Sequence, residues 1–285
     1  MKLCRFQTKE NKPRVGLMAD APKLLDLSAA GIDSLAAVLD TDDWSSQLKQ
    51  LSRDKLPQLT LSDVRLLAPV DQQEVWAAGV TYLRSKKARM DESEFSATAY
   101  DRVYDAERPE LFFKSLAEKV AAPGDPVGIR RDARWSVPEP ELALVLNSRG
   151  KVAGYTIGND MSSRDIEGEN LLYLPQAKVY RGSCALGPFI TVGETETAAR
   201  EWRIRLTIER AGQSVFSGET SVSQIKRRFD ELAQFLFRSQ VFPNGAVLLT
   251  GTGVVPPDTF TLAEGDVVDI EISGIGQLRN PVMVV

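Results

Sequence analysis

The chain has 285 residues and a net charge of −4, and 26% of its residues are charged while 43% are hydrophobic. These values are ordinary for a globular protein and do not predict a nucleic-acid-binding surface. No apolar run approaches the ~20 residues that span a bilayer, and the first residues lack an apolar signal segment, so no membrane partner is expected.

The sequence contains no histidine and two cysteines, Cys4 and Cys184. The absence of histidine excludes an imidazole base, a histidine-based triad and a histidine-ligated metal. Acid–base chemistry must therefore come from carboxylates, lysine, tyrosine, cysteine or metal-bound water. Two cysteines make no disulfide framework, and we expect both to be small buried side chains in a protein of the reducing cytoplasm.

Residues 1–66 predict a small N-terminal α/β domain, followed by a main domain over 67–285. Two short strands are expected over 2–6 and 14–18, joined by a polar turn. Ser34 is a suitable cap for a short helix over residues 35–39, and a second helical pattern begins at the aspartates 42–43. No catalytic pattern occurs in this unit, so we expect it to support the main domain or to make oligomer contacts.

A charge-dense segment at 82–110 follows a short apolar run at 75–80. The segment opens with basic residues and continues with acidic ones, which is typical of an exposed helix. Two interpretations are open: a solvated helix, or a mobile cover over a site that attracts an acidic substrate. The apolar residues between Glu110 and Lys114 then predict a strand.

Three carboxylates in the middle of the chain predict a cation site. Glu139 and Glu141 stand two residues apart before the apolar run 142–146, and side chains i and i+2 of a strand share a face. A turn signal at 147–150 predicts a hairpin that returns Asp160 to the pair. Such an oxygen-rich site suits Mg2+, Mn2+ or Ca2+. Alternatively, the glutamates form a solvated edge and Asp160 caps a helix.

The last third of the chain is rich in strands and turns. A hairpin is expected over 203–218 and a strand over 266–272, and the clearest helix of the chain is expected over 223–239, capped by its first residue. The glycine-rich turn 250–253 presents backbone amides and the Thr252 hydroxyl to an anion. Many short strands and few long helices predict an α+β, β-dominated fold.

Three motifs in chain order resemble those of the fumarylacetoacetate hydrolase superfamily: E-x-E at 138–141, N-D-x-S-x-R-D at 158–165 and Leu-Thr-Gly-Thr-Gly at 249–253. The resemblance extends from about residue 66 to the last residue. It implies a mixed β-sandwich roll, a small 2-keto acid as substrate and a homo-oligomer, either a dimer or a tetramer. The implied Mg2+ ligands are Glu139, Glu141 and Asp160.

One departure from the superfamily pattern is informative. Hydrolases of the superfamily carry G-x-N-Y-x-x-H, whereas this chain has Thr81 in place of the asparagine and Ser85 in place of the histidine. Hydrolytic carbon–carbon cleavage by that route is therefore not expected. The chain looks more like the superfamily's sugar-acid dehydratases, in which a glutamate before E-x-E and a lysine after the aspartate act in catalysis. The corresponding residues are Glu110 and Lys178.

The resemblance implies Mg2+-dependent dehydration of a 2-keto-3-deoxy sugar acid, such as 2-keto-3-deoxy-D-arabinonate to 2-oxoglutarate semialdehyde, through a metal-stabilised enolate. Lys178 is the best candidate base at C3 and Glu110 the best candidate acid at the C4 hydroxyl, or the two roles are exchanged. Otherwise Lys178 is a surface lysine. Three alternatives remain: a hydrolase of acylpyruvate-like 1,3-dicarbonyl compounds, a keto-acid decarboxylase or tautomerase, and a binding module without turnover.

Five further residues are predicted to contact the substrate. Thr252 and the nearby backbone amides, including that of Gly251, are candidates for its carboxylate. Arg84 and Ser85 lie in the segment that replaces the histidine motif. Lys114 is either a second substrate contact or a structural ion-pair partner, whereas Arg164 is expected to brace Asp160 or a loop.

Overall fold

The computed structural model describes residues 1–18, 22–41, 43–52, 55–82 and 102–285. The predicted substrate contacts Arg84 and Ser85 lie outside the described residues. The same is true of most of the charged segment that was expected to form a helix or a cover.

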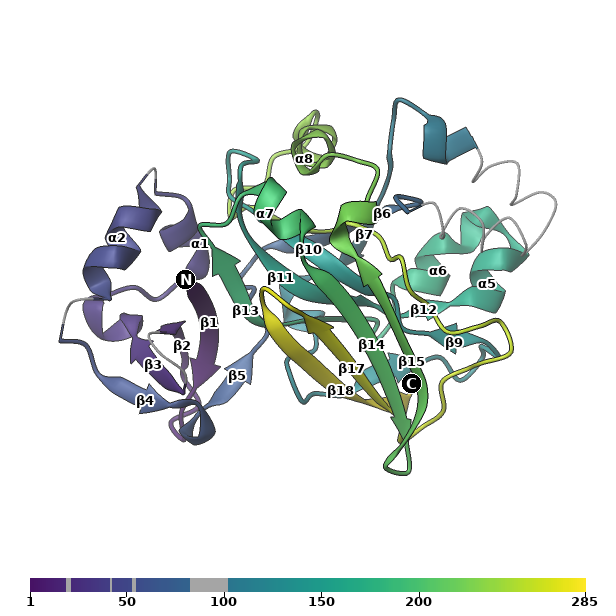
Figure 1. Cartoon of the computed structure of the whole chain (residues 1–285), viewed down its shortest axis with the longest axis horizontal. Helices are drawn as coiled ribbons and strands as arrows, with labels where there is room; N and C mark the ends of the chain where they lie inside the picture. Colours follow the sequence, from purple (N-terminus) through teal and green to yellow (C-terminus); the bar gives the residue numbers. More distant parts are fainter. Residues whose placement is uncertain (19–21, 42, 53–54, 83–101) are drawn as a thin grey trace.

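A mixed sheet forms the centre of the molecule (Figure 1). Among the described residues it has eleven strands, in the order β4-β3-β2-β1-β13-β11-β10-β16-β6-β7, with β5 also paired to β1. Their bounds are β1 (Lys2–Gln7), β2 (Pro13–Met18), β3 (Lys23–Asp26), β4 (Gln58–Thr60), β5 (Arg65–Leu67), β6 (Glu74–Gly79), β7 (Glu110–Ser115), β10 (Pro140–Leu146), β11 (Val152–Asp160), β13 (Cys184–Val192) and β16 (Ala246–Leu249).

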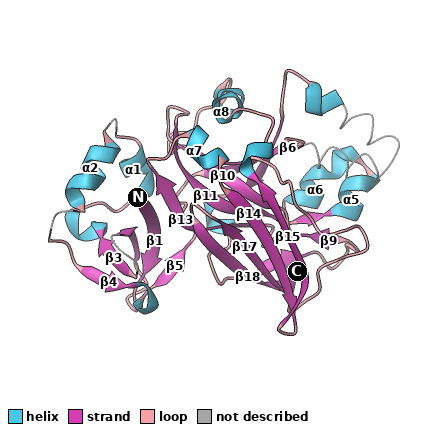
Figure 2. Cartoon of the chain, in the orientation of Figure 1, coloured by secondary structure: helices cyan, strands magenta, loops and turns pink. Residues whose placement is uncertain are grey.

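A smaller sheet packs on this central sheet, with the order β15-β14-β17-β18-β8, and a two-stranded ladder joins β9 to β12. The bounds are β8 (Val127–Ile129), β9 (Ser136–Val137), β12 (Ser162–Ser163), β14 (Arg203–Arg210), β15 (Gln213–Ser221), β17 (Val267–Ile272) and β18 (Gly276–Val284). The hairpin of β14 and β15 agrees with the one predicted over 203–218. Strands thus dominate the fold, as predicted (Figure 2).

Short helices surround the sheets. They are α1 (Leu35–Leu39), α2 (Trp44–Leu51), α5 (Arg164–Glu169), α6 (Leu174–Lys178), α7 (Glu196–Arg200) and α8 (Phe229–Phe237), with 3-10 turns at Leu27–Ala30, Leu61–Asp63, Ala117–Lys119, Leu171–Tyr173 and Val222–Gln224. Ser34 caps α1 by accepting from the amide of Ala37, as predicted, and Asp43 caps α2 in the same way. In Figure 1, α1 and α2 lie at one end of the molecule, and α5 and α6 lie at the other.

Strand β10 is buried on both faces, which explains why its sequence is a continuous apolar run. Leu142 and Leu144 belong to the core shared with β14 and β17, whereas Ala143 and Val145 belong to the core shared with α1 and α2. The predicted hairpin is present, because β10 pairs antiparallel with β11 and Glu141 lies opposite Gly158. This hairpin carries the predicted cation ligands.

The helix expected over 223–239 is shorter than predicted. It begins at Phe229, and Ser223 lies in a separate 3-10 turn. Ile225 is extended (φ −68°, ψ 118°) and bridges to Tyr82, while the Lys226 amide donates to the Thr81 carbonyl at 3.0 Å. Pairing with a distant segment therefore overrides the local helical pattern. Phe229, Leu232 and Leu236 are buried, as expected of the core face.

The first 66 residues share the central sheet with the rest of the chain. Strand β1 pairs with β13, with Lys2 opposite Thr191 and Leu3 opposite Ile190. Both Cys4 and Cys184 are buried and free, as expected from the sequence. The division into domains at residue 66 stays a prediction.

Leu144→Ala tests the importance of the doubly covered strand. Its side chain is fully buried between the two sheets, so truncation should lower the free energy of unfolding by about 2–5 kcal/mol. Urea denaturation measures this loss. The matched control is Val241→Ala, whose side chain is 83% exposed and whose effect should stay within about 0.5 kcal/mol. Equal losses in the two variants would contradict the assignment of Leu144 to the core between the two sheets.

Candidate active site

The three predicted carboxylates meet at one end of the β10–β11 hairpin. One carboxylate oxygen from each of Glu139, Glu141 and Asp160 lies within 4.8 Å of the other two, and all three residues are buried. The Asp160 amide donates to the Glu139 carbonyl at 2.9 Å, which ties the end of β11 to the residue before β10. The hairpin therefore gathers the triad, and neither a solvated edge nor a helix cap describes these residues.

Three basic side chains contact two members of the triad. Lys178 Nζ lies 3.0 Å from Glu139 Oε2 and 3.1 Å from Asp160 Oδ2. Arg164 Nη2 lies 2.8 Å from Glu139 Oε1, and Lys114 Nζ lies 2.5 Å from Asp160 Oδ1. All these side chains are at most 5% exposed, so the opposite charges compensate one another where water does not.

Glu141 is held differently from its two neighbours. Its Oε2 accepts a hydrogen bond from the Gly251 amide at 2.6 Å. Burial raises the pKa of Glu141 well above its usual range, and the nearby Asp160 and Glu139 carboxylates raise it further. A bound cation would favour the ionised carboxylate over the protonated acid.

The triad fits a divalent metal ion. A cavity of about 10 Å3 is lined by the three carboxylates, which is room for roughly one water-sized particle. Carboxylate oxygens are the donors that hard divalent cations prefer. The donor set and the size of the cavity thus agree with a metal held by Glu139, Glu141 and Asp160.

Both candidate acid–base residues lie close to this cavity. Lys178, the last residue of α6, lines it and donates to Ser162 Oγ at 2.5 Å. The side chain is 1% exposed, so Lys178 is not a surface lysine. Glu110 lies opposite Gly79 in the β6–β7 ladder, and a Cβ added at Gly79 would stand 2.0 Å from Glu110 Oε2. Because Gly79 lines the triad cavity, the Glu110 carboxylate lies directly beside the cavity wall.

Of the remaining predicted contacts, Thr252 and Gly251 line the cavity. Thr252 Oγ1 donates to the Val254 carbonyl at 3.1 Å, and the Gly251 amide is engaged by Glu141. Lys114 forms the ion pair that was one of its two predicted roles: its ammonium group contacts Asp160 and donates to the Met161 carbonyl at 3.1 Å. The substrate-binding roles of Thr252, Gly251 and Lys114 stay predictions.

Sequence reasoning missed two residues of the site. Ser162 was quoted within the N-D-x-S motif but received no role, although its hydroxyl holds Lys178. Phe112 lines the cavity, and its ring centroid lies 5.9 Å from Lys178 Nζ. The alternation along β7 was the available signal for Phe112, because it lies two residues from Glu110. Arg164 braces Glu139 of the triad; the sequence had suggested Asp160 or a loop.

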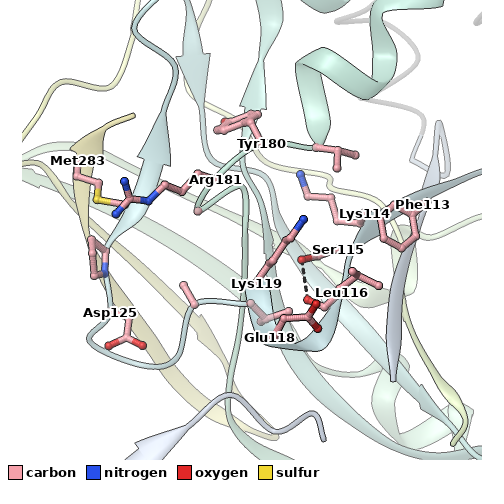
Figure 3. A pocket seen from close by; sticks show the side chains of 15 residues that line it. Phe113, Lys114, Ser115, Leu116, Glu118, Lys119, Asp125, Tyr180, Arg181 and Met283 are labelled. Atoms are coloured by element: carbon pink, nitrogen blue, oxygen red, sulfur yellow. Dashed lines mark hydrogen bonds between the residues drawn. The ribbon is translucent and has the colours of Figure 1, made fainter. Parts of the chain in front are cut away.

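A wider cavity of about 580 Å3 lies on another side of Lys114 (Figure 3). Its lining includes Glu118, Lys119, Tyr180 and Arg181. Of the predicted site residues that the structure describes, Lys114 alone lines it, and the Lys114 ammonium group is bonded to Asp160. Most of the predicted site residues therefore lie at the small triad cavity. The described part of the chain forms no helix long and apolar enough to cross a membrane.

Comparison with known proteins agrees with this site. Residues 74–283 match the family described as fumarylacetoacetate (FAA) hydrolase C-terminal, so the chain belongs to this family. The superfamily resemblance and the β-sandwich roll that it implied are thereby confirmed.

Two relatives carry the names of sugar-acid dehydratases. A protein of Haloferax volcanii named probable 2-keto-3-deoxyxylonate dehydratase is 49% identical over 223 residues, which is 78% of this chain and 76% of the relative. A 2-dehydro-3-deoxy-D-arabinonate dehydratase of Saccharolobus solfataricus is 40% identical over 230 residues, covering 80% and 77%.

A solved structure is similar over its full length. It is a 2-keto-3-deoxy-D-arabinonate dehydratase complexed with magnesium and 2,5-dioxopentanoate. The TM-score is 0.85 at 33% sequence identity, and the match covers 100% of this chain and 99% of that one.

Gly251→Ala tests whether the backbone that donates to Glu141 tolerates a side chain at this position. Gly251 has φ +90°, and an added Cβ would stand 2.1 Å from Thr81 Oγ1, so the variant combines backbone strain with a clash. Gly265→Ala is the control, since Gly265 has φ +85° and nothing within 4 Å of the added Cβ. We expect the control to lose about 1–2 kcal/mol of unfolding free energy and Gly251→Ala to lose clearly more. Thermal denaturation compares the two, and similar losses would contradict the clash.

Proposed function

We propose that this chain is a metal-dependent hydro-lyase that dehydrates a 2-keto-3-deoxy sugar acid of five carbons to 2,5-dioxopentanoate. The observation that carries the proposal is the cavity that unites the carboxylate triad with a buried lysine, in a chain without histidine. The names of the two relatives and of the similar solved structure support this choice of reaction. A hydrolytic mechanism in which histidine activates the water is excluded, because the chain contains no histidine.

Different side chains of this chain have different roles in the reaction. Bound at the triad, Mg2+ would serve as a Lewis acid that polarises the 2-keto group and makes the C3 protons more acidic. Lys178 is held in place by Ser162 and the triad carboxylates. A cation bound to those carboxylates would take over their charge compensation, so that Lys178 can release its own proton and take the C3 proton as the neutral amine. Glu110 then donates a proton to the departing C4 hydroxyl.

One water molecule leaves in this step, and a double bond forms between C3 and C4. A later proton shift converts the unsaturated keto acid into 2,5-dioxopentanoate. We assign the base to Lys178 because it lines the triad cavity, whereas Glu110 lies beside its wall. Thr252 and the amides of the turn 250–253 are proposed to bind the substrate carboxylate.

Three finer points belong to the same proposal. Mg2+ is proposed over Mn2+ or Ca2+ because the similar structure contains magnesium. A homo-oligomer, either a dimer or a tetramer, is proposed from the superfamily resemblance. The cytoplasmic location expected from cysteine usage also stays a prediction.

The products of a single incubation test the reaction. The protein is mixed with 2-keto-3-deoxy-D-arabinonate and Mg2+, and NMR spectroscopy follows the carbon chain. We expect 2,5-dioxopentanoate from the wild type, and about 10²–10⁴-fold lower kcat from Lys178→Met and Glu110→Gln, as for the loss of one acid–base group. Lys119→Met, a surface change, is the control. Cleavage of an acylpyruvate to pyruvate and a carboxylic acid, without dehydration of the sugar acid, would contradict the proposal.

Metal binding is tested without turnover. A cation that binds the folded protein raises its melting temperature with increasing concentration, and a chelator reverses the shift. We expect Mg2+ to do so in the wild type and to bind at least about 10-fold more weakly to Glu141→Gln, by comparison with measured losses of ligand-supporting residues. Glu271→Gln, on an exposed position of β17, should behave as the wild type. An unchanged Mg2+ response in Glu141→Gln would exclude this carboxylate as a ligand.

A further inference from the structure

A third cavity is lined by Glu110, whose carboxylate also packs against Gly79 of the triad cavity. It has a volume of about 320 Å3 and is lined by Glu110 and Glu167 together with the apolar side chains of Val103, Leu171 and Leu174. We call it the distal cavity. Its size falls in the range of small-molecule sites and exceeds that of the triad cavity, which is about 10 Å3.

Three structural elements contribute to both cavities at once. On each element one residue lines the triad cavity and another lines the distal cavity. The two are two positions apart on strand β7, three on α5 and four on α6, and each spacing places both side chains on one face of the element. The residues at the triad cavity are Phe112, Arg164 and Lys178, and those at the distal cavity are, in the same order, Glu110, Glu167 and Leu174. The two cavities are therefore neighbours that share the same three elements in their walls.

Glu110 marks the boundary between them. It lines the distal cavity, and its carboxylate packs against Gly79, which lines the triad cavity. A substrate whose keto acid end lies at the triad and whose C4 hydroxyl reaches Glu110 has C5 one bond away from C4, and therefore also near Glu110. The distal cavity is the larger space that Glu110 lines.

We propose that the distal cavity receives the end of the substrate beyond C4, and that Glu167 accepts a hydrogen bond from the C5 hydroxyl. This inference rests on the proposed function, because it places the keto acid end at the triad. Glu167 is 1% exposed and lies on α5, three residues after Arg164, which contacts Glu139. An ionised carboxylate acts only as an acceptor, so a ligand hydroxyl is a suitable donor to it.

The apolar wall suits the rest of such a ligand. Val103, Leu171 and Leu174 can contact the methylene group at C5, while Arg108 lies at the same cavity with its guanidinium 5.7 Å from the centre of the Phe235 ring. Glu167 is thus a residue that recognises one hydroxyl group, and it does not touch the reacting carbons C3 and C4.

A pair of unreactive ligands tests the assignment. 2-Oxopentanoate and 5-hydroxy-2-oxopentanoate differ only in the C5 hydroxyl, and neither has a C4 hydroxyl to lose. Calorimetry with the Mg2+-loaded protein should show about 10-fold tighter binding of the hydroxylated ligand, the usual effect of one hydrogen bond to a charged group. Glu167→Gln should abolish this preference, and Glu169→Gln, an exposed change on the same helix, should retain it.

Leu171→Phe tests the same cavity without altering a buried carboxylate. The larger side chain should weaken binding of 5-hydroxy-2-oxopentanoate by about 10-fold, as for a crowded apolar pocket. Leu172→Phe is the matched control, since Leu172 is 84% exposed and does not line the cavity.

Two outcomes would overturn the proposal: a wild type that binds both ligands equally, or a Glu167→Gln variant that keeps the preference while Leu171→Phe has no effect. Because neither ligand can lose water, the result does not depend on the dehydration reaction. A wild type that shows the preference but forms no 2,5-dioxopentanoate contradicts the proposed function and leaves the distal cavity assigned.

Discussion

The buried charge cluster at the end of the β10–β11 hairpin is the constraint on which the rest of the site depends. Three carboxylates that lie within 4.8 Å of one another repel strongly in a low-dielectric interior. Lys178, Lys114 and Arg164 reach two of them from three different elements, so that Glu139 and Asp160 each have two cationic partners. Removal of one cation would leave a buried carboxylate with a single partner. The elements that carry these cations must therefore be held in place by the fold.

The two packed sheets provide that support. Because β10 is covered on both faces, its direction and register are set by contacts on each side, and Glu141 lies on the same face as Ala143 and Val145. On the side of α5 and α6, short helices place Arg164 and Lys178 at the triad. The site is thus built on strands and helices, and this arrangement favours a fixed geometry for proton transfer.

The absence of histidine limits the reactions that this geometry can catalyse. Among the described residues, the polar side chains that line the cavity are the three carboxylates, Lys178, Arg164 and Thr252. Such a set suits an elimination, in which one group removes a proton and another donates one, since neither step needs an activated water. The distal cavity adds a place for C5 and its hydroxyl, next to the two carbons from which water is lost.

Local patterns determined several features of this protein. The alternation around Glu139 and Glu141, the turn signal before Lys151 and the position of Asp160 predicted the hairpin, because strand pairing across a short turn depends on neighbouring residues. These patterns left the triad as one of two interpretations, and the resemblance to the superfamily favoured it. The caps of α1 and α2 were also local. Tertiary packing determined where the helix predicted over 223–239 begins, because Ile225 pairs with Tyr82 and does not join the helix.

The partners of the charges could be found only in the folded chain. Lys114 Nζ meets Asp160 and Ser162 Oγ meets Lys178 through contacts between separate elements, and no sequence spacing specifies which side chain enters a shared cavity. The residue types and the hairpin were therefore set by the sequence, whereas the ion-pair partners of Lys114 and Lys178 were set by tertiary packing, since a buried charge is stabilised by an opposite one.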